Sequence, residues 1–231
     1  MKQNDTIFEL EKKIGVEFKN KDLLLQALTH RSYLNENTNW HLDHNERLEF
    51  LGDAVLELVV TDYLYANYHN PEGELTNWRA AIVNSIMLAK VSWKFNLNDY
   101  VLLSRGEAKD TGRARQYILT NTVEAVIGAI YLDQGYEKSK EFIVKFIITE
   151  LPVIIESKAY RDAKSLFQEK AQDRVGVTPT YEVIKEWGPD HARNFNIGVF
   201  LGDELVAEGE GLSKQEAQQV AAEEALKRKG W

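Results

Sequence analysis

The sequence predicts a multidomain protein, all-α in its first part and α+β in its second. Up to about residue 157, apolar residues return at steps of three and four, which is the period of a helix. A polar stretch follows, and beyond it "NFNIGVFL" (194–201) alternates in the manner of a half-buried strand. We therefore expect an all-helical domain over 1–157 and a small α-β-β-β-α domain over 158–231, with the linker at 156–162.

Five segments of the first domain carry the helical period, and turn-forming residues separate several of them. Gly, Pro, Asn and Asp dominate these separators, each being a residue that favours turns. No convincing alternation of period two occurs in this part, so we expect helices alone. The helical segments are 21–29, 45–66, 74–95, 115–132 and 136–148, and the separators are "HNPEG" (69–73), "NLND" (96–99) and "DTGR" (110–113).

The second domain is expected to begin and end with a helix. Ser213 and Glu216 have the spacing of a capping box, which places the start of the last helix there. "GD" (202–203), between two strand-like runs, indicates a tight hairpin. The expected order is helix 163–174, strands 180–187, 194–201 and 204–211, and helix 213–229.

The composition excludes several classes of protein. The 231 residues are 44% hydrophobic, which supplies a packed core, and the lack of cysteine rules out disulfides and thiolate metal sites. No signal peptide is visible, and no run approaches the roughly 20 apolar residues of a membrane span, so we expect a cytoplasmic protein without membrane contact. The net charge of −8 argues against a protein that coats nucleic acid, although an acidic metal site also contributes negative charge.

Three carboxylates interrupt the apolar segment "HNERLEFLGDAVLELVV" (44–60). Glu46, Glu49 and Asp53 are spaced by three and four residues, and because each residue turns a helix by about 100°, all three lie on one narrow face. Like charges so placed repel one another unless a cation compensates. A divalent ion such as Mg²⁺ prefers oxygen ligands and would do so. The plainer alternative is a solvated acidic face, and the surrounding apolar residues count against it.

A second segment has a matching feature. "ILTNTVEAVIGAIYL" (118–132) is apolar apart from Asn121 and Glu124, which share a face, and facing oxygens on two buried helices are how helical domains build metal sites. Glu72 and Glu74 offer a further ligand, but acids are common at helix N-termini because of the helix dipole, and we favour that interpretation. A di-iron oxidoreductase is excluded, because no histidine follows a glutamate by three residues.

Several motifs together resemble the ribonuclease III family, whose members are double-stranded-RNA endonucleases. The nine residues "NERLEFLGD" are the most specific part, and the resemblance covers almost the whole chain. The C-terminal part resembles the double-stranded-RNA-binding domain in its order of elements and in "FQE", "GPDH" and "GLSKQEA". The nuclease motifs are "HNERLEFLGDAVL", "ALTHRSY" (27–33), "EGELTNWRAAIVN" (72–84) and "ILTNTVEAVIGAIYLDQG" (118–135).

The resemblance implies a homodimeric endoribonuclease that depends on Mg²⁺, for which Mn²⁺ substitutes. Such an enzyme hydrolyses the strands of a duplex with metal-activated water, leaves 5′-phosphate and 3′-hydroxyl ends with a short 3′ overhang, and processes ribosomal RNA precursors and other structured transcripts. The implied catalytic residues are Asp53, Glu124 and Glu46, the implied metal ligands are Glu49, Asn121 and Glu124, and Glu72 is an additional candidate.

One position departs from the family pattern, because Asn121 stands where the family usually has Asp. An amide oxygen can still ligate Mg²⁺, but it brings no negative charge, so affinity for the ion should fall. The alternative function is therefore a double-stranded-RNA-binding protein with weakened or no cleavage. Retention of Glu46, Glu49, Asp53 and Glu124 favours the enzyme.

The second domain offers three candidate contacts to RNA. A-form duplexes are recognised by shape, through 2′-hydroxyls and phosphates. Gln168 on the first helix and His191 in "GPDHA" suit minor grooves, and Lys214 in the first turn of the last helix suits phosphate. Gln215 and Gln218 stand where the family often has lysines, which predicts a weaker hold on phosphate.

Overall fold

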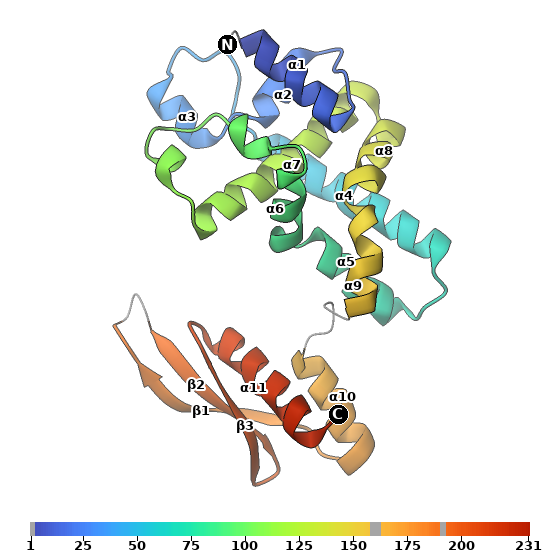
Figure 1. The fold of residues 1–231 in the computed structure, drawn as a ribbon, viewed down its shortest axis with the longest axis vertical. Helices are drawn as coiled ribbons and strands as arrows, with labels where there is room; N and C mark the ends of the chain where they lie inside the picture. The colour runs from blue at the N-terminus through green and yellow to red at the C-terminus, as the bar shows by residue number, and fades with distance from the viewer. Residues whose placement is uncertain (1–2, 158–162, 190–192) are drawn as a thin grey trace. The chain divides into compact units, whose positions relative to one another are not determined.

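Contacts between residues divide the chain into two units, Met1–Tyr160 and Arg161–Trp231, which are described separately (Figure 1). The computed structural model describes residues 3–157, 163–189 and 193–231. The first unit contains α1 (Gln3–Ile14), α2 (Lys21–Ala27), α3 (Arg31–Glu36), α4 (Glu46–Asn67), α5 (Glu72–Val83), α6 (Ser85–Trp93), α7 (Arg113–Gln134), α8 (Tyr136–Phe146) and α9 (Leu151–Ser157), with 3₁₀ turns at Leu97–Asp99, Glu107–Lys109 and Ile148–Glu150. The expected class, a helical domain followed by an α+β domain, is confirmed.

Two long helices form the centre of the first unit. α4 and α7 have 22 residues each, so each runs for about 33 Å at 1.5 Å per residue. α7 contacts α2, α4, α6 and α8, and it has buried residues on nearly every side, as a central helix must. Among the described residues, no helix has both the length and the apolar character needed to cross a membrane.

The segment 74–95 is two helices, and the prediction of one continuous helical segment was wrong. Asn84 adopts an extended conformation (φ −70°, ψ 161°) between α5 and α6. Its side chain accepts a hydrogen bond of 2.9 Å from the backbone N–H of Met87 and so caps α6. The apolar period continues through the break because both helices pack on the same core. The helices α1, α3 and α9 lie outside the helical segments predicted from periodicity.

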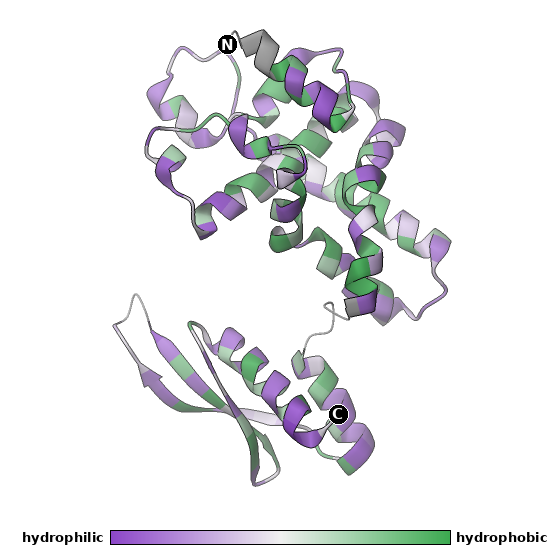
Figure 2. Cartoon of the chain, viewed as in Figure 1, coloured by the Kyte–Doolittle hydropathy of each residue, from purple (hydrophilic) through white to green (hydrophobic). Residues whose placement is uncertain are grey.

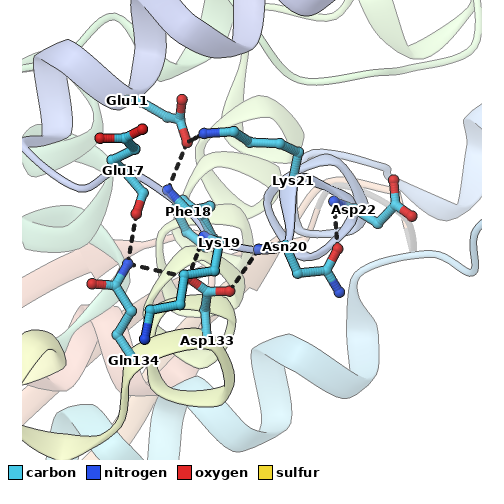
Figure 3. A network of polar contacts seen from close by, with 9 residues as sticks. All are labelled: Glu11, Glu17, Phe18, Lys19, Asn20, Lys21, Asp22, Asp133 and Gln134. Carbon is cyan, nitrogen blue, oxygen red and sulfur yellow. Dashed lines mark hydrogen bonds and ion pairs between the residues drawn. The ribbon is translucent and has the colours of Figure 1, made fainter.

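A network of hydrogen bonds ties the N-terminal helices to the end of α7 (Figure 3). The carboxylate of Asp133 accepts bonds from the backbone N–H groups of Lys19 (2.8 Å) and Asn20 (2.9 Å). Burial acts to raise the pKa of Asp133, but these bonds outweigh it and hold the pKa below its ordinary value. The carboxylate of Glu11, which is buried, accepts from the N–H of Phe18 at 2.7 Å. The two bonds to Asp133 fix the C-terminal end of the helix that carries Asn121 and Glu124.

The second unit is a three-stranded antiparallel sheet with two helices. Its elements are α10 (Ala163–Val175), β1 (Thr180–Trp187), β2 (Asn194–Leu201), β3 (Glu204–Gly211) and α11 (Lys214–Lys229), and the strand order is β1-β2-β3. Gly202, in the tight turn between β2 and β3, has φ +60°. Ser213 caps α11 by accepting from the N–H of Glu216 at 3.1 Å, while Glu216 accepts from the N–H of Leu212 at 2.9 Å. In a standard capping box the glutamate side chain accepts from the N–H of the N-cap residue itself. Here it accepts from the N–H of the preceding residue, Leu212.

The core of the second unit lies between the sheet and its helices. Phe167 of α10 is fully buried, and Ala217, Ala221 and Ala225 line the inner face of α11. A Cβ on Gly209 of β3 would lie 2.2 Å from the backbone nitrogen of Ala221, so strand and helix approach closely here. Figure 2 shows hydrophobic and hydrophilic residues alternating at short intervals along α11, as an amphipathic helix requires.

Candidate catalytic centre and RNA-binding surface

Two glycines allow α4 and α7 to cross almost in backbone contact. A Cβ on Gly52 would lie 1.7 Å from the carbonyl oxygen of Glu124, and a Cβ on Gly128 would lie 2.2 Å from that of Leu48. Real side chains do not tolerate such distances, so only glycine fits at either position. Gly52 precedes Asp53 directly, and Gly128 follows Glu124 by one turn. The close crossing therefore brings the polar residues of the two helices to one place.

The crossing unites most of the residues predicted from the sequence. Glu49 and Asp53 of α4 act electrostatically on Glu124 of α7, and the side chain of Asn121 hydrogen bonds to Glu49. Burial raises the pKa of Glu124 to about 8, and the charges of Asp53 and Glu49 add to this effect. Burial also raises the pKa of Glu49, with contributions from Glu46 and Asp53, and the bond from Asn121 opposes the rise.

Glu46 differs from its neighbours because an arginine and a histidine lie beside it. The guanidinium of Arg31 lies 3.5 Å from one carboxylate oxygen, and the ring nitrogen Nδ1 of His44 lies 3.8 Å from the other. Sequence reasoning missed Arg31, which reaches Glu46 from α3. Both partners are more than a third exposed, so the pairs are weak and open to replacement by a substrate group.

The donor set at the crossing fits a hard divalent cation. Glu49, Asn121 and Glu124 would each bind a metal through oxygen, which hard cations prefer. The charged groups that raise the pKa values of Glu49 and Glu124 are other carboxylates, so a cation here would be attracted by all of them. Over the described part of the chain, no group of three or more His, Cys, Asp or Glu side chains is placed so that it could hold a metal ion without further ligands. Mg²⁺ seldom needs such a group, because it usually binds one or two carboxylates and keeps waters or substrate phosphates as its other ligands.

Glu72 is not brought to this cluster. It lies in the first turn of α5, beyond the C-terminal end of α4, whereas Glu46 and Glu49 lie at the N-terminal end. Its carboxylate accepts a hydrogen bond of 2.9 Å from the hydroxyl of Thr76. This contact agrees with the plainer interpretation of an acid at a helix N-terminus.

The start of α4 is held by the "ALTHRSY" segment. Asn45 is buried, its backbone N–H donates to the carbonyl of Thr29 at 2.9 Å, and its amide donates to the carbonyl of Ala27 at 3.2 Å. The N–H of Glu49 donates in turn to the carbonyl of Asn45 at 2.9 Å. Asn45 therefore sets where the carboxylate-bearing helix begins. Sequence reasoning missed this role, although a polar residue just before an apolar helix was a usable signal.

An aromatic side chain stands out from the same helix. Phe50 is 82% exposed, and it borders a groove of about 620 Å³ whose walls include Arg47, Leu51 and Leu132. Leu132, near the end of α7, is 54% exposed. Large apolar groups exposed next to a groove are typical of a protein–protein contact.

The three residues predicted to bind RNA differ in their surroundings. Gln168 is exposed on α10. Lys214 is the first residue of α11, and its ammonium lies 3.3 Å from the carboxylate of Glu186 and 5.5 Å from the centre of the Phe195 ring. His191 lies outside the described residues. Lys164 of α10, which was not predicted, donates to Gln218 at 2.6 Å, so that glutamine holds a lysine of the neighbouring helix.

The chain thus has a helical unit with a carboxylate cluster at a helix crossing, followed by an α-β-β-β-α unit. Residues 20–151 match the family model described as Ribonuclease-III-like, and residues 163–229 match the Double-stranded RNA binding motif. The chain belongs to the ribonuclease III family and is a double-stranded-RNA endoribonuclease of the metal-dependent kind that this family comprises.

Curated relatives agree along nearly the whole chain. Ribonuclease 3 of Nitratiruptor sp. is 43% identical over 220 residues, which is 95% of each chain, and that of Natranaerobius thermophilus is 45% identical over 223 residues, 96% of each. The solved nuclease domain of ribonuclease III from Campylobacter jejuni is 42% identical, with a TM-score of 0.56, covering 62% of this chain and 97% of that domain. Its description refers to a region involved in dimer formation.

Proposed function

We propose that the cluster at the crossing of α4 and α7 is the catalytic centre, with Mg²⁺ held by Glu49, Asn121 and Glu124. The observation that carries this proposal is that Glu49 and Asp53 lie close enough to act on Glu124, with Asn121 bonded to Glu49 and burial raising the pKa of both glutamates. A site that concentrates like charges in a partly buried place is costly without a cation, which is why such clusters mark functional sites.

Each side chain has a distinct task in this proposal. When bound, Mg²⁺ lowers the pKa of a water and offsets charge on the phosphate. Glu124, with its pKa near 8, holds a proton in the metal-free protein and gives it up when the ion enters. Asn121 orients the carboxylate of Glu49 through its hydrogen bond. Asp53, which is exposed beside the pair, orients the attacking water.

Glu46 lies at the rim of this centre beside Arg31 and His44. Arg31 and His44 can turn from Glu46 to the scissile phosphate because both are partly exposed. We assign Glu46 the task of holding these groups near the phosphate. We leave Glu72 outside the catalytic set, because its carboxylate is engaged with Thr76 at the other end of α4.

The second unit holds the duplex in the same proposal. Lys214 contacts phosphate, and Gln168 and His191 reach minor grooves. Two copies of the chain pair through the face that bears Phe50, which gives each duplex two cutting sites. The products then carry 5′-phosphate and 3′-hydroxyl ends with a short 3′ overhang, and the substrates are ribosomal RNA precursors and other structured transcripts in the cytoplasm.

A double-stranded-RNA-binding protein with weakened or no cleavage is the second candidate, and Asn121 is the observation that favours it. One experiment separates the candidates and tests the site. The parent and Glu124→Gln are incubated with a labelled duplex and Mg²⁺, and binding is measured by mobility shift in Ca²⁺. We expect the parent to cut, and the variant to bind the duplex without cutting it. Loss of binding together with cleavage in the variant would show that the site is wrongly assigned.

A further inference from the structure

One carboxylate lies among the cations that are assigned to RNA. Glu186, near the end of β1, has one oxygen 3.3 Å from the ammonium of Lys214 and the other 3.5 Å from the guanidinium of Arg193. Arg193 directly precedes β2, and Lys214 begins α11. Three segments that are separate in sequence therefore meet at this one anion.

The fold positions Lys214 without the help of Glu186. Glu186 pairs with Phe195 across β1 and β2, and Phe195 pairs with Gly211 of β3. The ammonium of Lys214 lies over the ring of Phe195, 5.5 Å from its centre. A Cβ on Gly211 would lie 2.6 Å from the backbone nitrogen of Ala217, so the first turn of α11 is packed against this end of the sheet. The carboxylate is therefore an added partner of a lysine that is already in place.

Both ion pairs of Glu186 are loose compared with others in the same unit. Lys227 lies 2.6 Å from Glu224, and Lys229 lies 2.8 Å from Glu204. Glu186 is 35% exposed in its side chain and its two cations are about half exposed, so the pairs contribute little to stability. Binding to a duplex, in contrast, depends on phosphates that Lys and Arg neutralise. Residues 158–231 hold only 11 such cations against 13 Asp and Glu, and Glu186 engages two of them.

We infer that Glu186 competes with RNA phosphate for Lys214 and Arg193 and thereby limits the affinity of the second unit for duplex RNA. A phosphate that approaches either cation must displace the carboxylate and then remains beside its negative charge. The inference rests on the proposed function, because it takes Lys214 as a phosphate contact. Glu186 is therefore a residue that sets how tightly substrate and product are held.

The test is Glu186→Gln, which keeps the size of the side chain and removes its charge. Binding of a labelled duplex is measured in Ca²⁺ by fluorescence anisotropy, between about 50 and 200 mM salt. We expect the variant to bind roughly three- to tenfold more tightly at the low end, and the gain to shrink as salt rises, because exposed charges are screened. Glu204→Gln is the matched control, since it removes an equivalent charge paired with Lys229 in the same unit. We expect its affinity to equal that of the parent.

A second pair of proteins assigns the cause. In a Lys214→Ala background, Glu186→Gln should yield a smaller gain, because the two residues act on each other. Weaker duplex binding by Glu186→Gln would overturn the inference, since Glu186 would then hold Lys214 and Arg193 in the positions that bind RNA. An equal gain in affinity from Glu204→Gln would overturn it too, because the effect would then come from net charge alone. If Lys214→Ala weakens binding but Glu186→Gln changes nothing, the inference alone fails. If neither matters, the proposed RNA-binding surface fails with it. Melting curves of every variant confirm that the fold is kept.

Discussion

Asn121 on α7 donates a hydrogen bond to the carboxylate of Glu49 on α4, across the point where the two helices touch. An aspartate at this position would have no hydrogen to donate unless it were protonated. Burial raises the pKa of Glu49, and the amide opposes this rise without adding charge to a site where like charges already repel one another. Asn121, which stands where the family usually has Asp, therefore stabilises the charged form of Glu49 in the metal-free protein.

Gly52→Ala tests the helix crossing. The new Cβ would lie 1.7 Å from the carbonyl oxygen of Glu124, so the helices must move apart. Overpacking of this kind costs about 1–3 kcal/mol, which for a chain of this size lowers the melting temperature by several degrees. Cleavage should fall much further, because Glu49 and Asp53 move away from Glu124. The measurement is a melting curve beside a cleavage assay.

Gly73→Ala is the matched control for that variant. Gly73 lies in the first turn of α5, and a Cβ there meets nothing within 4 Å. We expect its melting temperature and cleavage rate to equal or slightly exceed those of the parent. Normal cleavage by Gly52→Ala would mean that the close crossing does not position the site.

Periodicity predicted α4 because its buried residues, among them Leu48, Val55 and Val59, return at steps of three and four, but it missed α1, α3 and α9. It did not predict the break at Asn84, since a capping residue can end a helix without interrupting the apolar pattern. The carboxylates of the site could be predicted from spacing on two helices. Their mutual placement could not, because it depends on Gly52 and Gly128, whose effect exists only when the helices meet.

The pKa of Glu124 predicts how the metal-free protein depends on pH. Between the ordinary pKa of 4.5 and the folded value of about 8, the folded protein holds a proton that the unfolded chain has lost. The contribution of Glu124 to stability is therefore complete below pH 4.5 and is lost as the pH rises through 8. In EDTA, we expect the melting temperature of the parent to fall by several degrees between pH 6 and pH 9, because each kcal/mol corresponds to about 2–4 °C. The melting temperature of Glu124→Gln should not show this fall. Parallel curves for the two proteins would contradict the buried site.

Phe50→Ala tests the proposed dimer. Truncating an aromatic anchor at an interface costs about 2 kcal/mol or more, which is a loss of at least roughly 30-fold in affinity. Analytical ultracentrifugation should show the parent near twice the mass of one chain, and the variant shifted toward one chain. Ile86→Ala is the control, because Ile86 is 72% exposed on α6, away from the groove beside Phe50. A parent that stays monomeric at micromolar concentration would rule out the paired cutting sites.

Lys214→Ala should weaken duplex binding and flatten its dependence on salt. Each phosphate contact removed takes about 0.7–0.9 from the slope of log K against log salt. Because Glu186 already shares the ammonium, we expect a change at the lower end of that range. A titration of duplex binding at several salt concentrations measures the slope. An unchanged slope would show that Lys214 does not contact phosphate.

Asn121→Asp addresses the central claim that Asn121 is a ligand in a metal site. The substitution is nearly isosteric, removes the bond to Glu49, and adds a negative charge beside the ion. Mg²⁺ gains from a charged oxygen ligand, whereas the metal-free protein gains one more repulsion. The variant should therefore need less Mg²⁺ than the parent for half-maximal cleavage, melt at a lower temperature in EDTA, and recover more on addition of the ion.

The most direct measurement is a titration of duplex cleavage with Mg²⁺ on the parent and on Asn121→Asp, with melting curves of both proteins taken in EDTA and in Mg²⁺. The account predicts that the aspartate variant reaches half-maximal cleavage at a lower Mg²⁺ concentration and shows a larger metal-induced rise in melting temperature. Equal Mg²⁺ requirements and identical melting behaviour would contradict it, because Asn121 would then lie outside the metal site.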